Sequence, residues 1–138
     1  MPTLAADVLL LTATPVESKA TLQAFAAATQ HKAVPQSLDD RIYFGLGTVN
    51  GARVCLTQSE MGAGGLGATL QTTHKGITAL QPAAVIMVGI AFGVNEAKQA
   101  IGDILVTEQL RLYDLQRVGT ADGQPHIVLR GDKPHASP

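Results

Sequence analysis

The stretch ARVCLTQSEMGAGGLGATL, residues 52–70, joins an apolar, strand-like run to a helix-like run through a glycine-rich turn. Gly62, Gly64 and Gly67 fit the G-x-G-x-x-G pattern of a turn that opens a helix. Such a turn can present backbone N–H groups to phosphate, ribose or an attacking water. The glycines can equally serve backbone geometry alone. The pattern leaves both interpretations open.

A dinucleotide-binding turn also needs an acidic residue about 20 positions further on, which binds a ribose hydroxyl. No Asp or Glu occurs between Glu60 and Glu96. The turn is therefore not a dinucleotide site, and we expect no cofactor. The four histidines show no metal-ligand spacing such as H-x-x-x-H, so we expect no metal site either.

Upstream, DVLLLTA at residues 7–13 has the continuous apolar character of a strand buried on both faces. Thr14, Pro15 and Glu17 then form the pattern of a capping box with proline at the first helical position. This predicts a helix from there to about Thr29. Residues 30–40 are polar and interrupted by proline, and we expect a loop.

Residues 41–58 predict a β-hairpin, because Asn50-Gly51 lies between two β-rich runs. AAVIMVG at 83–89 and IGDILVTEQL at 101–110 predict further strands, joined by a loop at 90–100. HIVLR at 126–130 is a weaker strand candidate.

Apolar strands that alternate with helices predict an α/β fold over one domain, residues 1–138. We expect a three-layer αβα sandwich with a mixed, mostly parallel sheet. Loops 13–17, 59–67 and 89–93 should meet at the carboxyl ends of its strands, where ligands bind in such folds. The sequence ends on Ser137-Pro138, the pattern of a helix start, so we expect the domain to be incomplete at its C-terminus.

Composition and charge limit the kinds of partner that the protein can bind and the compartment in which it is found. The net charge is −1, so no basic field exists to attract a nucleic acid or an anionic membrane. The longest apolar run, residues 83–94, is too short to span a bilayer, and the N-terminus lacks the positive flank of a secretory signal. We expect a cytoplasmic protein. The single cysteine, Cys55, lies in a strand-like run and is expected to be a buried apolar residue.

Four segments in order carry a family resemblance: LLLTATPVE (9–17), TVNGARVCLTQSEMGAGGLGA (48–68), PAAVIMVGIAFG (82–93) and IGDILVTEQ (101–109). Together they resemble the nucleoside phosphorylase and nucleosidase superfamily, which includes 5′-methylthioadenosine/S-adenosylhomocysteine nucleosidases. The resemblance covers almost the whole chain but only the first half to two-thirds of the family's domain. It is closest to a phosphorylase-like branch that serves as the effector end of larger bacterial signalling or defence proteins.

The resemblance implies that Glu17 holds and activates the attacking water. Cleavage of an N-glycosidic bond builds an oxocarbenium-like sugar, so a carboxylate that orients water and takes its proton fits the chemistry. Glu17 can also complete the capping box to Thr14, and the two roles do not exclude each other.

Ser59 and Gly62 match the family segment beside the ribose and the nucleophile, and Gly89, Ala91 and Gly93 match the loop near the base. Ile90 stands where many members have serine, which puts phosphate use in doubt. Phe92 stands where glycine is common; it could stack on a purine or belong to the core. Asp103 is expected to tie a loop through backbone hydrogen bonds.

The resemblance implies N-glycosidic cleavage of a purine nucleoside, by a homo-oligomer or as part of a larger multidomain protein. Phosphorolysis needs a cationic cradle, which the arginine-free first loop lacks, so we expect hydrolysis. The family's ribose-gripping glutamate and purine-protonating aspartate have no candidate in this sequence, so the chain is expected to be weak or inactive alone. The alternative is a non-catalytic nucleoside- or nucleotide-binding effector module that kept the fold.

Overall fold

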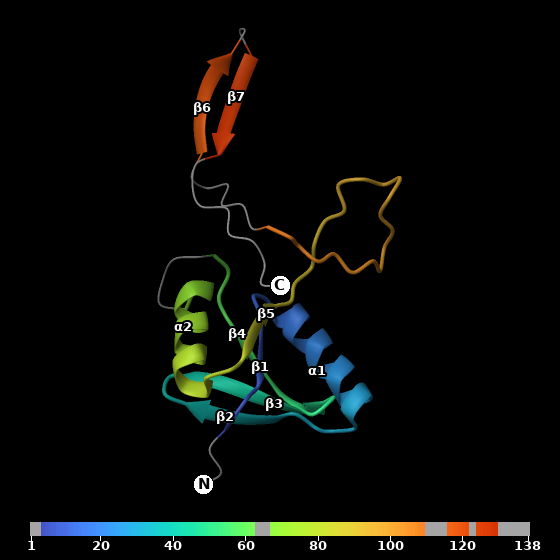
Figure 1. Cartoon of the computed structure of the whole chain (residues 1–138), viewed down its shortest axis with the longest axis vertical. Coiled ribbons are helices and arrows are strands. Elements are labelled where there is room, and N and C mark those ends of the chain that lie inside the picture. The colour runs from blue at the N-terminus through green and yellow to red at the C-terminus, as the bar shows by residue number, and fades with distance from the viewer. Residues whose placement is uncertain (1–3, 63–66, 110–115, 122–123, 130–138) are drawn as a thin grey trace. The chain divides into compact units, whose positions relative to one another are not determined.

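The computed structural model describes residues 4–62, 67–109, 116–121 and 124–129. The chain divides into two compact units, Met1–Ile90 and Ala91–Pro138. The first contains a five-stranded sheet with two helices, and the second contains a two-stranded antiparallel ribbon (Figure 1). That residues 1–138 form a single domain stays a prediction.

The first unit has a run of three strands between its two helices. In chain order it contains β1 Val8–Thr12, α1 Pro15–Thr29, β2 Val34–Leu38, β3 Arg41–Val49, β4 Ala52–Gln58, α2 Thr69–Leu80 and β5 Ala84–Met87. The second unit contains β6 Gln116–Ala121 and β7 Gln124–Leu129.

The sheet of the first unit is mixed, with strand order β2-β3-β4-β1-β5. β1 lies between β4 and β5 and runs parallel to both, with Leu10 opposite Leu56 on one side and Ile86 on the other. β2, β3 and β4 pair in antiparallel fashion. The predicted hairpin is confirmed: Asn50 and Gly51 both have positive φ, 49° and 87°, as a tight turn between twisted strands requires. The α/β fold class is confirmed.

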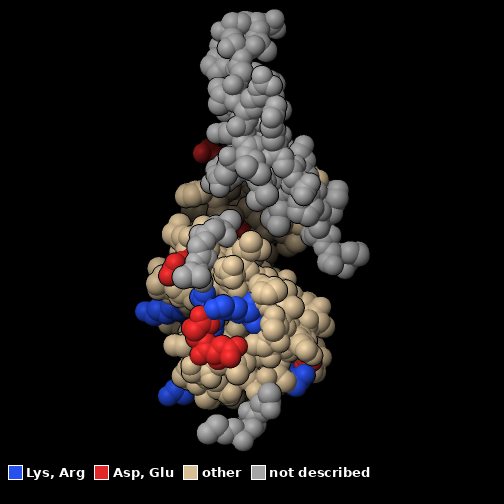
Figure 2. Space-filling view, turned by 90° about the vertical axis from the view of Figure 1, so that its left-hand side faces the viewer, with Lys and Arg blue, Asp and Glu red and all other residues tan. Residues whose placement is uncertain are grey.

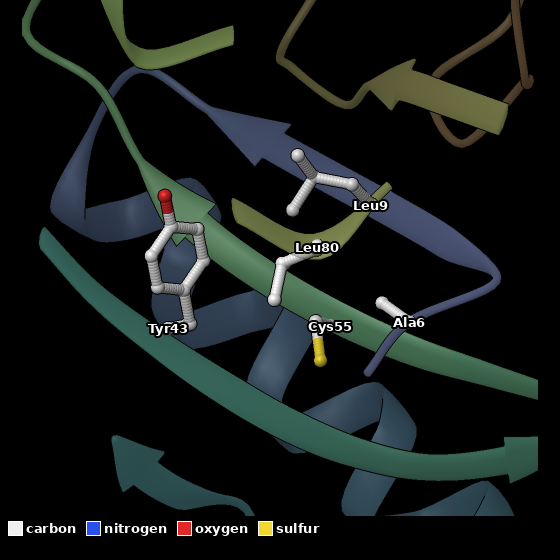
Figure 3. Close-up of a cluster of buried hydrophobic side chains, with 5 residues drawn as sticks. All are labelled: Ala6, Leu9, Tyr43, Cys55 and Leu80. Carbon is white, nitrogen blue, oxygen red and sulfur yellow. The ribbon is translucent and has the colours of Figure 1, made fainter. Parts of the chain in front are cut away.

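The two helices cover opposite faces of this sheet (Figure 1). Because side chains alternate along a strand, neighbouring residues of β1 enter different cores. Leu9 packs with Ala6, Tyr43, Cys55 and Leu80 of α2 (Figure 3). Leu10 packs with Leu46, Val54 and Leu56, against Leu22 and Phe25 of α1. The layers are therefore helix, sheet and helix, as expected, and Cys55 is buried as expected.

The prediction of a loop over residues 30–40 is wrong for β2. Val34–Leu38 forms the outer strand of the sheet as described and pairs with β3. Pro35 lies opposite Phe44 in this pairing. Proline is tolerated there because an edge strand has backbone groups that face away from the ladder and need no partner.

The prediction of a strand over residues 101–110 is also wrong for its described part, 101–109, where no strand forms. A run of apolar residues becomes a strand only where a neighbouring strand receives its backbone hydrogen bonds. The weaker candidate at 126–130 is confirmed within β7, up to Leu129. Ser137-Pro138, the pattern of a helix start, lies outside the described residues.

Charged side chains are mixed on the face shown in Figure 2, with acidic and basic residues of the described chain interspersed. The described residues form two ion pairs at the surface: Arg53 with Asp7, at 2.8 Å, and Lys75 with Asp40. Within the described residues, every helix is too short or too polar to cross a membrane.

Candidate active site

The candidate site lies at the carboxyl end of the parallel part of the sheet. β1, β4 and β5 run in the same direction, so the segments that follow them begin at one edge. Backbone hydrogen bonds hold these beginnings together: Ser59 N–H donates to Thr12 C=O at 2.8 Å, and Val88 N–H donates to Leu11 C=O at 2.8 Å. The beginnings of three segments far apart in the sequence thus lie together; that the whole of loops 59–67 and 89–93 joins them stays a prediction.

Glu17 occupies the centre of this edge and makes the predicted capping box. Its N–H donates to Thr14 Oγ1 at 3.3 Å, while Glu17 Oε2 accepts from Thr14 N–H at 2.9 Å and from Ala13 N–H at 3.1 Å. The four first N–H groups of a helix have no partner inside it, which is why such a box stabilises α1. The cap interpretation of Glu17 is confirmed.

The other oxygen of Glu17 reaches a different strand. Glu17 Oε1 accepts a hydrogen bond of 3.0 Å from Ile90 N–H, beyond the end of β5. A Cβ at Gly89 would lie 3.2 Å from the same oxygen. Glycine therefore lets the backbone after β5 approach the carboxylate closely. The carboxylate joins the segments that follow β1 and β5.

These contacts keep Glu17 ionised. The backbone N–H of Ile90, followed by the contacts with Thr14 and Ala13, lowers the pKa of Glu17 below its ordinary 4.5, against the opposing effect of partial burial. Hydrogen bonds to a carboxylate favour its charged form. At neutral pH Glu17 is an anion that accepts hydrogen bonds.

Ser59 lies at the same edge but is only 2% exposed. Its hydroxyl donates to Thr12 C=O at 3.3 Å and lies 3.1 Å from Thr69 Oγ1. Because the single proton of Ser59 is directed to Thr12, Thr69 must be the donor in the second contact. Ser59 thus ties β4 to β1 and to the start of α2.

Two glycines of the turn are required for different physical reasons. Gly62 has φ +98°, a conformation that other residues rarely adopt, and its C=O accepts from Thr69 N–H at 3.1 Å. Gly67 has no such φ; instead, the carboxylate of Glu60 fills the place where a Cβ would lie. Gly64 lies outside the described residues. Backbone geometry explains Gly62, and a close side-chain contact explains Gly67.

Ala91, Phe92 and Gly93 belong to the second unit. Phe92 is 91% exposed, so its ring is not part of a core. Gly93 precedes a loop in which Gln99 Oε1 accepts from Val94 N–H and Asn95 N–H, at 2.8 and 2.9 Å. Asp103 Oδ2 accepts from Ala100 N–H at 2.8 Å, so the prediction that Asp103 ties a loop is confirmed.

Two features of this edge were not predicted from the sequence. One is Glu60, which carries the second carboxylate near the turn. The other is Ser18, which is buried and hydrogen-bonds to both Thr12 Oγ1 and Gln58 Oε1 at 2.7 Å. Ser18 follows Glu17 directly, and a polar residue beside the capping box is the feature of the sequence that could have indicated its role. No neighbouring residue indicates the contact with Gln58.

The comparisons with known proteins concern the family and the fold of the chain. The model of the phosphorylase superfamily matches residues 7–138. A search of curated proteins gave no match. Among solved structures, the fold is similar to the nucleosidase MTAN of Helicobacter pylori, with 21% identity, TM-score 0.57, and coverage of 78% of this chain and 45% of that one.

A second similar structure is the 5′-methylthioadenosine/S-adenosyl homocysteine nucleosidase of Campylobacter jejuni. It shares 16% identity at TM-score 0.54, over 91% of this chain and 53% of that one. The chain thus spans about half the length of both solved proteins. The matched family model extends over nearly the whole chain, which belongs to the phosphorylase superfamily.

Proposed function

We propose that this chain forms the water-holding part of a nucleosidase site, which hydrolyses the N-glycosidic bond of a purine nucleoside. The observation that carries the proposal is the Glu17 carboxylate, fixed by three backbone N–H groups from two segments at the strand ends. A carboxylate has about four acceptor positions. In the proposed site, a water donates to the carboxylate beside these backbone groups.

Glu17 would act by orientation more than by basicity. Its lowered pKa makes it a weak base in the resting protein. As the glycosidic bond breaks, the sugar gains positive charge, and the proton of the attacking water becomes more acidic. A fixed carboxylate then stabilises the sugar cation and accepts that proton without reorganising.

Hydrolysis is favoured over phosphorolysis by the charges at this edge. The described residues of the segments that follow β1, β4 and β5 (13–17, 59–62 and 88–90) include no Lys, Arg or His. A transferred phosphate needs cationic partners. Ile90 also offers only its backbone N–H, and Glu17 already uses it.

The second candidate function is a nucleoside-binding effector module without catalysis. The same Glu17 contacts favour it, because they satisfy the helix start and join two loops whether or not a reaction occurs. This chain matches about half of each of the two similar structures, and this partial match is compatible with either function. In both cases we propose a purine nucleoside as ligand, and a homo-oligomer or a larger multidomain protein as the assembly.

The test is adenine release from methylthioadenosine, S-adenosylhomocysteine and adenosine, with and without phosphate. Glu17→Gln should lower the rate by about 100-fold or more, because the neutral amide neither stabilises the sugar cation nor accepts the proton of the water. Glu96→Gln, which removes the same charge from the second unit, is the matched control. Nucleoside binding without any turnover would favour the effector module, and a folded protein that neither binds nor cleaves would contradict both functions.

A further inference from the structure

Glu60 places a second carboxylate against the glycine turn. A Cβ on Gly67 would overlap Glu60 Cδ and lie 2.5 Å from each of the carboxylate oxygens. Any side chain at position 67 would collide with the carboxylate in this position. The carboxylate therefore occupies space that only glycine leaves open. The absence of a positive φ at Gly67 means that its backbone conformation does not require glycine.

The backbone fixes this arrangement. Glu60 N–H donates to Gly67 C=O at 2.8 Å, and Glu60 forms a parallel bridge with Ala68. Glu60 is thereby held beside the first turn of α2, which begins at Thr69.

The start of α2 has no other negative group among the described residues. Its N-cap, Ala68, makes no side-chain hydrogen bond, and its first turn contains no acidic residue. The N-terminus of a helix carries partial positive charge and attracts anions. The carboxylate of Glu60 lies against Gly67, two residues before α2, so an incoming phosphate meets a like charge near this helix start.

Glu17 adds a second negative charge at the same edge. It follows β1, and Glu60 follows β4, the strand parallel and adjacent to β1. The nearest basic residue along α1, Lys19, is exposed on the second turn of the helix. The described part of this edge is therefore anionic.

We propose that Glu60 is a specificity-determining residue, whose carboxylate against Gly67 makes the site select uncharged nucleosides and water over nucleotides and inorganic phosphate. Like charges at short range oppose binding, and a repulsive group at a site lets it reject one ligand class. The inference rests on the proposed function and names the substrate class of that site.

The first experiment measures binding of adenosine and of adenosine 5′-monophosphate by calorimetry. Wild type should bind the monophosphate at least about ten-fold more weakly than adenosine, and higher salt should reduce this difference because it screens charge. Glu60→Gln should remove most of the discrimination with little change for adenosine. Glu96→Gln, which changes net charge equally, should behave as wild type.

Gly67→Ala gives a second test that keeps the charge. The added methyl group must displace the carboxylate of Glu60, a flexible side chain, while the backbone tolerates alanine. Discrimination should fall in this variant too. Retention of full discrimination in Glu60→Gln, or equal affinity of wild type for both ligands, would overturn the proposal.

A third experiment uses inorganic phosphate and does not depend on nucleoside binding. Phosphate should raise the thermal unfolding temperature of Glu60→Gln above that in chloride of equal ionic strength, and should not do so for wild type. If no nucleoside binds but this difference appears, the proposed function fails and the role of Glu60 stands. If Glu60→Gln gains no response to phosphate, the role of Glu60 is refuted.

Discussion

Glu17 Oε1 accepts a hydrogen bond of 3.0 Å from the backbone N–H of Ile90, 73 residues further along the chain. The other carboxylate oxygen caps α1, so one side chain fixes a helix start and joins the loop that follows β5. Structural and catalytic roles therefore share the same geometry: the contacts that stabilise the loop also orient the carboxylate. Substitutions of Glu17 must be judged by stability as well as by activity.

The contribution of Glu17 to stability should depend on pH. Its pKa is lowered in the folded state, chiefly by the Ile90 N–H, so the folded protein binds this proton less readily than the unfolded chain. The resulting stabilisation is complete above the ordinary pKa of 4.5 and is lost as the pH falls through the lower folded value. Wild type should exceed Glu17→Gln in free energy of unfolding by more at pH 7 than at pH 3.

Urea denaturation of both proteins at the two pH values checks this. Other carboxyl groups with lowered pKa, such as Asp7 and Asp40, are present in both proteins and cancel in the difference. A gap that stays constant between pH 7 and pH 3 would show that the charge of Glu17 is not stabilised in the folded state.

Ser18 should matter for stability more than its size suggests. Its hydroxyl contacts Thr12 Oγ1 and Gln58 Oε1 at 2.7 Å and Thr14 C=O at 3.1 Å, so it links α1 to two strands. Ser18→Ala removes this partner from the fully buried Thr12 hydroxyl, whereas Thr14 C=O keeps its bond from Ser18 N–H. Loss of a partner at a buried polar group costs about 1–3 kcal/mol. Urea denaturation measures the loss.

Thr78→Ala is the matched control, because the Thr78 hydroxyl also donates to a backbone C=O but on an exposed face of α2. It should change the free energy of unfolding by no more than about 0.5 kcal/mol. Equal effects of the two substitutions would mean that the link through Ser18 contributes nothing specific.

Cys55 should be inert in the folded protein. It is 2% exposed, and burial raises the pKa of its thiol. Reaction requires an accessible thiolate, so a disulfide reagent at neutral pH should label Cys55 only as fast as the protein opens. Labelling followed with and without urea checks this, and rapid native labelling would show that the strands around Cys55 open readily.

Local signals in the sequence predicted the parts of the fold that local chemistry decides. The capping box at Thr14 and Glu17 and the turn at Asn50-Gly51 each follow from a few adjacent residues. β2 was missed because an edge strand that contains proline has the composition of a loop. Its position is decided by β3, not by its own residues.

The candidate site was predictable only in part, for the same reason. Parallel strand ends bring the three segments together, but which atoms meet depends on side-chain paths between distant residues. The contact of Glu17 with Ile90 and that of Glu60 with Gly67 are of this kind. The glycine pattern included Gly67 but did not indicate why glycine is needed at that position. The structure gives the reason: the carboxylate of Glu60 lies where a Cβ would be.

Gly76, in the middle of α2, should resist substitution although alanine is the better helix former. A Cβ at Gly76 would lie 2.5 Å from Leu9 Cδ2, and Leu9 is fully buried in the core shared with Tyr43. Leu9 has little room to move, so overpacking should cost about 1–3 kcal/mol, against a gain in helix propensity of about 1 kcal/mol.

Gly76→Ala should therefore destabilise the protein, whereas Gly45→Ala, where an added Cβ meets no atom within 4 Å, should have a smaller effect. Thermal and urea unfolding of the two variants compare them directly. A Gly76→Ala protein as stable as wild type would mean that α2 can shift away from the sheet. Since α2 begins at the glycine turn, such a shift would also move Gly67 relative to Glu60, and the selectivity between adenosine and its monophosphate would change with it.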